Sequence, residues 1–324
     1  MEISVVMSVY NSRDYLKEAI ESILNQTFKE FEFIIIDDGS TDDSIEIIRQ
    51  YASIDSRIIL IENESNIGLA GSLNKGIRRA TGKYIARQDA DDISVLERLR
   101  IQLEFANAHT DIDVIGSNCF VIDINSEVVY EEKSLSSDRD FQKNLLNRSA
   151  IFAHGCAFIK REKLIESGLY DERFYYVQDG ELWLRLLSYN AKIYVLEDTL
   201  YYYRFTPIRN PQKRQAKAKF NEVLQMLYVN YDDSKKVDLK LEEIYQYVET
   251  ESAELNPFYL SNYWKGLANA SFLNSNKKIK SYFYLLKASY EKNSVSNYMK
   301  FFALAVMYVF PRSMVGSFIK LLRA

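Results

Sequence analysis

The chain has 324 residues, is 47% hydrophobic and carries a formal net charge of −4, so it is long enough for about two domains with a sizeable core. This weak acidity gives no overall attraction to nucleic acid, and we expect no nucleic-acid partner. Two cysteines, Cys119 and Cys156, lie in apolar, strand-like segments. They indicate buried thiols of a reducing compartment rather than a disulfide framework.

The first third of the chain alternates strand and helix patterns. Apolar runs of strand length occupy residues 3–9, 31–36, 57–61 and 83–88. Helical spacing of apolar residues follows at 16–24, from Ser40 or Thr41 to about 52, at 69–80 and at 94–108. We expect Asn11 or Ser12 to cap the first of these helices. The alternation predicts βαβ units and a parallel sheet that binds ligands at the carboxyl ends of its strands.

After residue 108 the pattern changes to that of a mixed sheet. We expect strands at 114–123 and 128–130 with a turn at Asn125 and Ser126, a strand at 155–159, a helix at 180–189, and short strands at 192–196 and 200–205. From about residue 211 the chain has a helical pattern. We therefore expect two domains, an α/β domain over residues 1–210 and a helical C-terminal region over residues 211–324.

Polar clusters follow all four predicted parallel strands. They are Ser8-Val9-Tyr10-Asn11, Asp37-Asp38-Gly39-Ser40, Asn66-Ile67-Gly68 and Asp89-Ala90-Asp91-Asp92. Because the carboxyl ends of parallel strands meet at one edge of a sheet, these four clusters predict a single binding crevice.

The most informative cluster contains Asp89, Asp91 and Asp92. Three neighbouring carboxylates repel one another and are typical of a site that holds a cation or a reacting group. One or two carboxylates completed by substrate phosphates are the usual ligands of Mg²⁺. Taken alone, the cluster fits a metal site and an aspartate-rich turn or helix cap equally well.

These four clusters and a fifth, Gln178-Asp179-Gly180-Glu181-Leu182-Trp183-Leu184-Arg185, stand in the order seen in family 2 glycosyltransferases. The chain resembles that family over about residues 1–205. The resemblance implies an inverting, metal-dependent enzyme of the GT-A fold, which is Rossmann-like, with a mostly parallel central sheet and helices on both faces. It also implies a nucleotide-diphospho-sugar as the donor substrate.

On the donor side, the resemblance implies that Asp38 hydrogen-bonds the base, typically uracil, and that Tyr10 packs against it. It places Asp91 on Mg²⁺ or Mn²⁺ and Asp89 at the ribose or in the metal shell. The residues that we expect to contact the donor are Ser8, Tyr10, Asp38, Asn66 and Asp89.

On the acceptor side, Asp179 matches the general base of the family, although its position also suits a helix cap. His154 is expected either to contact acceptor or phosphate or to be a hydrogen-bonded structural histidine. Trp183 is expected in the core, and by resemblance near the acceptor pocket.

Two positions depart from the family pattern. Gln178 stands where the family usually has Glu, so Asp179 has one like charge fewer beside it and should ionise more easily. Leu73 stands where the family often has Arg, and Lys75 or Arg78 is the candidate to replace that cation at the diphosphate.

The C-terminal residues are strongly basic. From 276 to 324 the chain has nine Lys or Arg and one acid, a charge of +8. Residues 301–310 are apolar, and 314–322 place apolar side chains on one helical face. Such a helix either lies in a membrane interface rich in anionic lipid or packs on the catalytic domain or on another subunit of a homodimer. No run reaches the ~18 apolar residues of a membrane span, and no signal peptide opens the chain. We expect a cytoplasmic protein, peripheral at the inner face of the cell membrane.

The resulting prediction is an inverting glycosyltransferase that moves a sugar from a UDP-sugar to a saccharide or lipid-linked saccharide. Two alternatives stay open. The first is a nucleotidyltransferase that forms sugar nucleotides, which needs a glycine-rich loop after the first strand, where this chain has Tyr10-Asn11-Ser12-Arg13. The second is a non-catalytic subunit that binds nucleotide-sugars.

Overall fold

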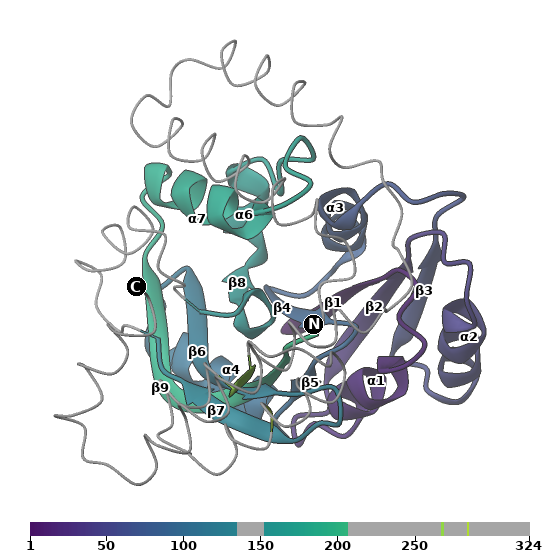
Figure 1. Ribbon diagram of the computed structural model, residues 1–324. Helices are drawn as coiled ribbons and strands as arrows, with labels where there is room; N and C mark the ends of the chain where they lie inside the picture. Colours follow the sequence, from purple (N-terminus) through teal and green to yellow (C-terminus); the bar gives the residue numbers. More distant parts are fainter. Residues whose placement is uncertain (135–151, 207–266, 269–283, 285–324) are drawn as a thin grey trace, which may run out of the picture. The chain divides into compact units, whose positions relative to one another are not determined.

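The computed structural model describes residues 1–134, 152–206, 267, 268 and 284. These residues fall into two compact units (Figure 1). The first unit contains every described residue between 1 and 120 and between 132 and 204. The predicted boundary near residue 210 and almost all of the predicted helical region 211–324 lie outside the described residues.

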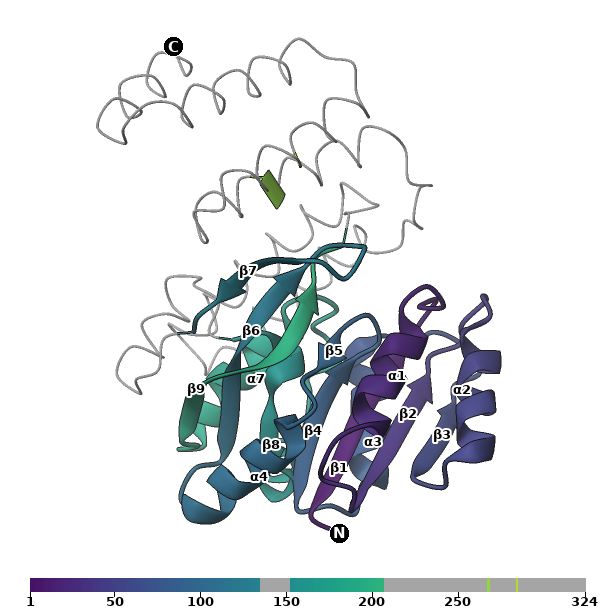
Figure 2. The ribbon, with the colours of Figure 1, turned by 90° about the horizontal axis from the view of Figure 1, so that it is seen from below.

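Four parallel strands form one half of the sheet in the first unit, in the order β3 (Ile58–Glu62), β2 (Phe31–Asp37), β1 (Ile3–Val9) and β4 (Tyr84–Asp89). Figure 2 shows them side by side. Their bounds match the predicted strands to within one residue. The prediction of a parallel sheet built from βαβ units is confirmed.

The other half of the sheet is antiparallel. Its strands are β8 (Phe158–Lys160), β6 (Val114–Ile122), β9 (Ile193–Arg204) and β5 (Ile93–Ser94), in that order from β4 outwards. β8 runs antiparallel to β4, β6 to β8 and β5 to β9. The mixed sheet that was expected beyond the fourth strand is therefore confirmed.

Helices cover both faces of this sheet, as predicted (Figure 1). One face carries α1 (Leu16–Leu24), α2 (Ser44–Ile54) and α4 (Arg98–Ala108), and the other carries α3 (Leu69–Arg79), α6 (Arg161–Glu166) and α7 (Gln178–Ser188). Strand side chains alternate between the faces: Val5 and Met7 of β1 pack with the α1 side, whereas Val6 packs with the α3 side. Each face thus has its own hydrophobic core.

Several element predictions were wrong in detail. Residues 93–94 pair with Tyr201 and Tyr202 as β5, so α4 begins at Arg98 rather than at 94. The strand expected at 155–159 is a short 3₁₀ turn, η1 (His154–Cys156), followed by β8. The two strands expected at 192–205 are one strand, β9, and α6 was not predicted. The strands β5, β8 and β9 form by pairing with strands that are distant in the sequence, which the local pattern of apolar residues does not reveal. The helix α6 is short and mostly polar, so it has no clear apolar face to predict it.

The predicted helix caps are also wrong, and the residues concerned join two loops instead. No side chain caps α1 or α2. Asn11, at a φ of 49°, accepts a hydrogen bond from the Thr41 amide through its side chain at 2.8 Å, and its own amide donates to the Ser40 hydroxyl at 3.1 Å. The loop after β1 is thereby fastened to the loop after β2.

The second unit includes residues 121–131, the tip of a hairpin made by β6 and β7 (Val128–Glu132). Val129 packs there with Leu267, Ala268 and Tyr284. The Tyr284 hydroxyl donates a hydrogen bond to Asp123 at 3.1 Å. Among the described residues, no helix is long and apolar enough to cross a membrane.

Gly39 offers a test of how tightly the strand-end loops are packed. Its φ is +71°, and a Cβ there would lie 2.8 Å from the backbone carbonyl carbon of Ser65. We expect Gly39→Ala to lower the free energy of unfolding by about 2 kcal/mol or more, because it adds a left-handed backbone penalty to a backbone clash. Urea unfolding measures this loss.

Gly71→Ala is the matched control. Its Cβ would meet only the exposed side chain of Ile67, at 3.2 Å, and Ala is favoured over Gly within a helix by about 1 kcal/mol. An equal loss of stability in both variants would contradict a specific constraint at Gly39.

Candidate active site

The register of the parallel strands brings three of the polar clusters together. Ser8 on β1 lies directly beside Asp89 on β4 and beside Ile36 on β2. The Asp38 amide then donates to the Val9 carbonyl at 2.8 Å. The donor-side residues of β1, β2 and β4 thus share one edge of the sheet, as the strand order predicts.

Asp38 organises the loop that follows β3. It is 2% exposed. One carboxylate oxygen accepts hydrogen bonds from the Asn63 side chain at 2.8 Å and the Ile67 amide at 2.9 Å, and the other accepts one from the Gly68 amide at 2.9 Å. Asn66 accepts a second bond from Gly68 at 3.0 Å through its exposed side chain. The fourth polar cluster is therefore tied to the second.

Tyr10 differs from these anchored side chains. It follows β1 and is 44% exposed, so one face of its ring is available to a planar ligand. An exposed aromatic ring near a buried carboxylate is a suitable environment for a nucleobase, which needs a stacking surface and a hydrogen-bond acceptor. The roles of Tyr10, Asp38, Ser8 and Asn66 in donor binding stay predictions.

The acidic cluster carries excess negative charge in a desolvated setting. Burial and then the charge of Asp89 raise the pKa of Asp91 to about 6. Burial and the charges of Asp91 and Asp89 also raise the pKa of Asp92 well above its ordinary value, and its Oδ2 atom has no hydrogen-bond partner among the described residues. Carboxylates crowded in this way are stabilised by a bound cation.

Two buried arginines partly balance these acids. The Arg87 guanidinium, 2% exposed, forms an ion pair with Asp89. Arg204, the last residue of β9, donates from its amide to Asp92 and from its Nε atom to the Asp91 carbonyl, both at 2.7 Å, and a guanidinium nitrogen contacts Glu18 at 2.7 Å. The acidic loop is thus held in place by β4 from within the sheet and by the end of β9.

The cluster fits a divalent cation of the Mg²⁺ type. Within the described residues, no group of three or more His, Cys, Asp or Glu side chains surrounds a metal position. Asp91 and Asp89 could supply one or two hard oxygen ligands, which is the number expected when substrate phosphates complete the shell. The crowding of Asp89, Asp91 and Asp92, which raises the pKa of Asp91 and of Asp92, gives a physical reason for a cation at this place.

Asp179 lies in the first turn of α7 and is not its N-cap. The helix begins at Gln178 after Val177, and no side-chain cap is formed. One Asp179 carboxylate oxygen accepts a hydrogen bond from the Gly180 amide at 2.9 Å. The helix-cap interpretation is therefore wrong, and the negative charge sits where the α7 dipole favours it.

Tyr170 connects Asp179 to the acidic cluster electrostatically. Its pKa is raised first by burial and then by the charges of Asp179 and Asp89, against the opposing effect of Arg87. Coulomb interactions weaken with distance and are strongest in a desolvated setting. Asp179 and Asp89, which are 90 positions apart in the sequence, both raise the pKa of this buried phenol.

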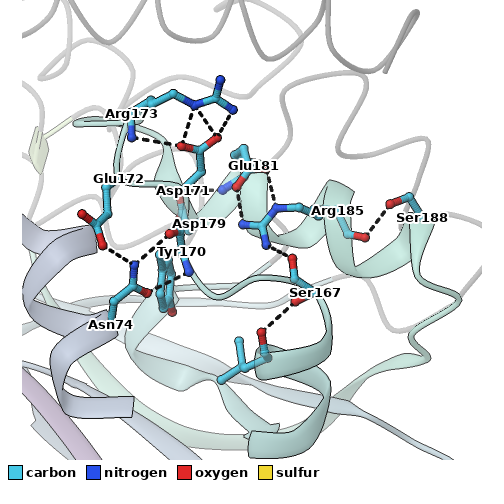
Figure 3. Close-up of polar contacts among 12 residues, drawn as sticks. Asn74, Ser167, Tyr170, Asp171, Glu172, Arg173, Asp179, Glu181, Arg185 and Ser188 are labelled. Atoms are coloured by element: carbon cyan, nitrogen blue, oxygen red, sulfur yellow. Dashed lines mark hydrogen bonds and ion pairs between the residues drawn. The ribbon is translucent and has the colours of Figure 1, made fainter. Parts of the chain in front are cut away.

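Asn74 clamps the segment that contains Tyr170, as Figure 3 shows. Its side chain donates to the Tyr170 carbonyl and accepts from the Tyr170 amide, both at 2.9 Å, and it also donates to Glu172 at 2.9 Å. In the same view Arg185 joins Glu181 to the Ser167 carbonyl. The segment before α7 is therefore fastened to α3, and α7 itself is fastened to the end of α6.

His154 is bound within the fold. Its Nε2 atom lies 2.7 Å from the Tyr170 hydroxyl. Burial and then the positive charge of Arg87 hold the pKa of His154 well below its ordinary value, so the ring is neutral at pH 7. This setting is that of the hydrogen-bonded structural histidine. A contact between His154 and a substrate stays a prediction.

Trp183 lies in the core, as the apolar face of its helix predicts. It is 2% exposed, and its ring lies 5.1 Å from that of Phe152 and 6.2 Å from that of His154, measured between centroids. The indole supports the residues that surround Asp179. Its expected place near an acceptor pocket stays a prediction.

The two candidate diphosphate cations have different surroundings. Lys75 donates a hydrogen bond to the Asn63 side chain at 2.7 Å, and Asn63 in turn donates to Asp38. Arg78 lines an open cavity of about 370 Å³ together with Tyr170 and Arg173. Lys75 is therefore linked to the donor-side loop, whereas Arg78 faces the segment before α7.

Sequence reasoning did not find Arg87, Asn63 or Tyr170 and gave Asn74 no role. Arg87 could have been suspected, because a charged residue within an apolar strand requires a partner. Tyr170 and Asn74 gave no such signal, since tyrosines are abundant in this chain and the clamp joins Asn74 to residues nearly a hundred positions away.

The clamp at Asn74 can be tested by Asn74→Asp. The substitution replaces a donor by a second acceptor facing the Tyr170 carbonyl and Glu172, so we expect a loss of about 1–3 kcal/mol in the free energy of unfolding. Urea unfolding measures the loss. Asn107→Asp, an exposed position on α4, is the control, and a similar loss there would contradict the clamp.

A second prediction concerns the pH dependence of stability. In the unfolded state the His154 ring accepts a proton below about pH 6.5, whereas in the folded state it stays neutral. The free energy of unfolding should therefore fall as the pH is lowered from 7 to 5, by at most about 1.4 kcal/mol per pH unit. His154→Gln should remove this contribution.

The chain has one other histidine, His109, which is exposed. His109→Gln is therefore the control and should keep the pH dependence of the unmodified chain. Urea unfolding at several pH values measures both variants, and equal behaviour of the two would refute a buried neutral His154.

Comparison with known proteins places this geometry in a family. The glycosyl transferase family 2 model matches residues 4–168. An uncharacterised glycosyltransferase of Methanocaldococcus jannaschii is 37% identical over 219 residues, which cover 67% of this chain and 75% of that protein. The amylovoran biosynthesis glycosyltransferase AmsE of Erwinia amylovora is 28% identical over 199 residues, which cover 61% of this chain and 74% of AmsE.

Solved structures share the fold at low sequence identity. Residues 1–349 of S. aureus TarS in complex with UDP superpose with a TM-score of 0.54 at 20% identity, covering 91% of this chain and 92% of that TarS fragment. The mannosyltransferase PcManGT of Pyrobaculum calidifontis, in complex with GDP-Man and Mn²⁺, gives 0.53 at 16% identity, covering 97% and 83%. The matched family model and the relatives agree with the strand order and the strand-end clusters: the chain belongs to glycosyltransferase family 2 and has the GT-A fold.

Proposed function

We propose that this glycosyltransferase moves a sugar, with inversion, from a UDP-sugar to a saccharide or lipid-linked saccharide. The observation that carries the proposal is the strand register that sets Ser8 beside Asp89 and bonds Asp38 to the end of β1 at one edge of the sheet. The charges of Asp89 and Asp179 both raise the pKa of Tyr170, which supports a site shared by this edge and the first turn of α7.

Uracil is the proposed base of the donor. Tyr10 supplies an exposed ring, and Asp38 a buried carboxylate at the same sheet edge. Among structural neighbours, TarS has been solved with UDP and PcManGT with GDP-Man, so a nucleoside diphosphate is the shared ligand chemistry.

A divalent cation, Mg²⁺ or Mn²⁺, is proposed at Asp91, with Asp89 in or beside its shell. When bound, it would neutralise the negative charge that develops on the departing diphosphate. The Asp91 carboxylate lies in a desolvated environment, and Arg204 donates a hydrogen bond to the backbone carbonyl of Asp91. PcManGT was solved with Mn²⁺, which agrees with this choice of ion.

Asp179 is proposed as the general base that takes the proton from the acceptor hydroxyl. Inversion in a single displacement needs one proton acceptor and no covalent intermediate. Asp179 lies in the first turn of α7, beside the neutral Gln178. Asn74 and the Glu181–Arg185 pair would keep this turn in position.

The acceptor is proposed to be a growing surface polysaccharide or its lipid-linked precursor. AmsE is named for amylovoran biosynthesis, and a putative teichuronic acid biosynthesis glycosyltransferase of Bacillus subtilis is 30% identical over 208 residues. A cytoplasmic location with peripheral membrane contact and a homodimer remain part of the proposal. The basic C-terminal residues on which they rest lie outside the described residues.

The test combines a donor screen with variants of two aspartates. Thermal shift with nucleotide-sugars and Mn²⁺ should show a rise in melting temperature for the donor. With this donor, Asp179→Asn should lower the rate of sugar transfer by about 100- to 10,000-fold while donor binding persists, and Asp91→Ala should remove the response of donor binding to Mn²⁺. The control is Asp198→Asn, at an exposed position of β9.

The outcomes separate the alternatives. Full transfer activity in Asp179→Asn would refute the base assignment. Release of pyrophosphate from a nucleoside triphosphate and a sugar phosphate would identify a nucleotidyltransferase. Donor binding without hydrolysis or transfer to any acceptor would identify a non-catalytic binding subunit.

A further inference from the structure

Tyr175 lies on the segment that leads into α7, and its ring covers Gly68. The side chain is 40% exposed. A Cβ placed on Gly68 would lie 3.7 Å from two atoms of the Tyr175 ring, so the ring lies beside the position that a side chain would occupy on this glycine. The Gly68 amide is one of the donors to Asp38. Tyr175 therefore stands over the loop that presents the donor-side carboxylate.

The surroundings of the Tyr175 hydroxyl point to the same place. Burial first, and then Tyr10 and Asp38, raise the pKa of Tyr175. Tyr10 and Tyr175 are thus two partly exposed tyrosines near one buried carboxylate, although they come from opposite ends of the α/β domain. Tyr176 packs edge-on against Tyr175, with ring centroids 5.0 Å apart and planes at 87°, which restrains the ring in this orientation.

The backbone after Tyr175 is strained. Val177 has a φ of 55° and a ψ of 25°, a left-handed conformation that is rare for a β-branched residue. Such strain persists where surrounding contacts hold a segment in place, and it occurs often at functional sites. Here it allows the chain to present Tyr175 towards Gly68 and then to start α7 with Gln178 and Asp179.

We propose that Tyr175 is a second aromatic contact for the base of the nucleotide donor, alongside Tyr10. The assignment rests on the proposed function, because it needs a nucleotide at the edge formed by Tyr10 and Asp38. Nothing in the family motifs points to this residue. The consequence is that the bound base touches the segment that positions Asp179, four residues further along the chain, so that donor binding and placement of the general base are linked.

The experiment measures nucleoside diphosphate affinity by isothermal titration in the presence of Mn²⁺. UDP and GDP are titrated into the full chain and into three variants. Tyr175→Ala should weaken binding of the preferred nucleotide on the order of tenfold, as expected when an aromatic ring is removed from a base. Tyr175→Phe keeps the ring and should bind within about twofold of the unmodified chain.

Tyr189→Ala is the matched control, since Tyr189 is 42% exposed and lies at the other end of α7. It should bind with unchanged affinity. Melting temperatures without ligand verify that each variant is folded, and Tyr175→Leu replaces Tyr175→Ala should the latter melt early. Uridine is titrated as well, because loss of a base contact should weaken its binding by a similar factor.

Two negative results are distinguishable. If the unmodified chain binds UDP or GDP and Tyr175→Ala binds it equally well, the role of Tyr175 is refuted and the proposed function stands. If the unmodified chain binds neither nucleotide, the proposed function fails, and this assignment fails with it. Equal losses in Tyr175→Phe and Tyr175→Ala would likewise contradict ring stacking.

Discussion

The parallel register of β1 with β2 and β4 is the constraint on which the site depends. It sets Ser8 beside Asp89 and brings Asp38 within a hydrogen bond of the end of β1. Once these strands are aligned, the following loops have little freedom, because they bond to one another: Asn11 to Thr41, and Asp38 to Gly68. Polar groups that are scattered along ninety residues of sequence are thereby concentrated at one edge without any of them belonging to a common motif.

Charge balance at this edge is incomplete within the described residues. Arg87 pairs with Asp89, and Arg204 bonds the backbone around Asp91 and the carboxylate of Asp92. The remaining negative charge explains the raised pKa of Asp91 and suits a ligand that arrives with a cation. The buried arginines hold the acids in position, whereas the surplus negative charge would attract a cation.

The sequence allowed the parallel half of the sheet and the four strand-end clusters to be predicted, because buried parallel strands are uniform apolar runs that end in polar turns. The antiparallel half was less accessible. The local sequence of residues 93–94 predicts a helix, but in the fold they pair with β9 as a strand. The middle of β9 contains polar residues, which obscures its strand pattern. Tyr170, Asn74 and Tyr175 matter through contacts with distant loops. Their residue types are ordinary, so their importance became visible only once the chain was folded.

One feature of β9 bears on how this architecture diversifies. The strand ends at Arg204, whose amide donates a hydrogen bond to the Asp92 carboxylate and whose side chain donates one to the Asp91 carbonyl. The polypeptide therefore leaves the sheet beside the acidic loop. An extension joined after this residue starts next to that loop whatever its own sequence is. Exchange of such an extension would alter the surroundings of the loop while the sheet and its aspartates stay intact.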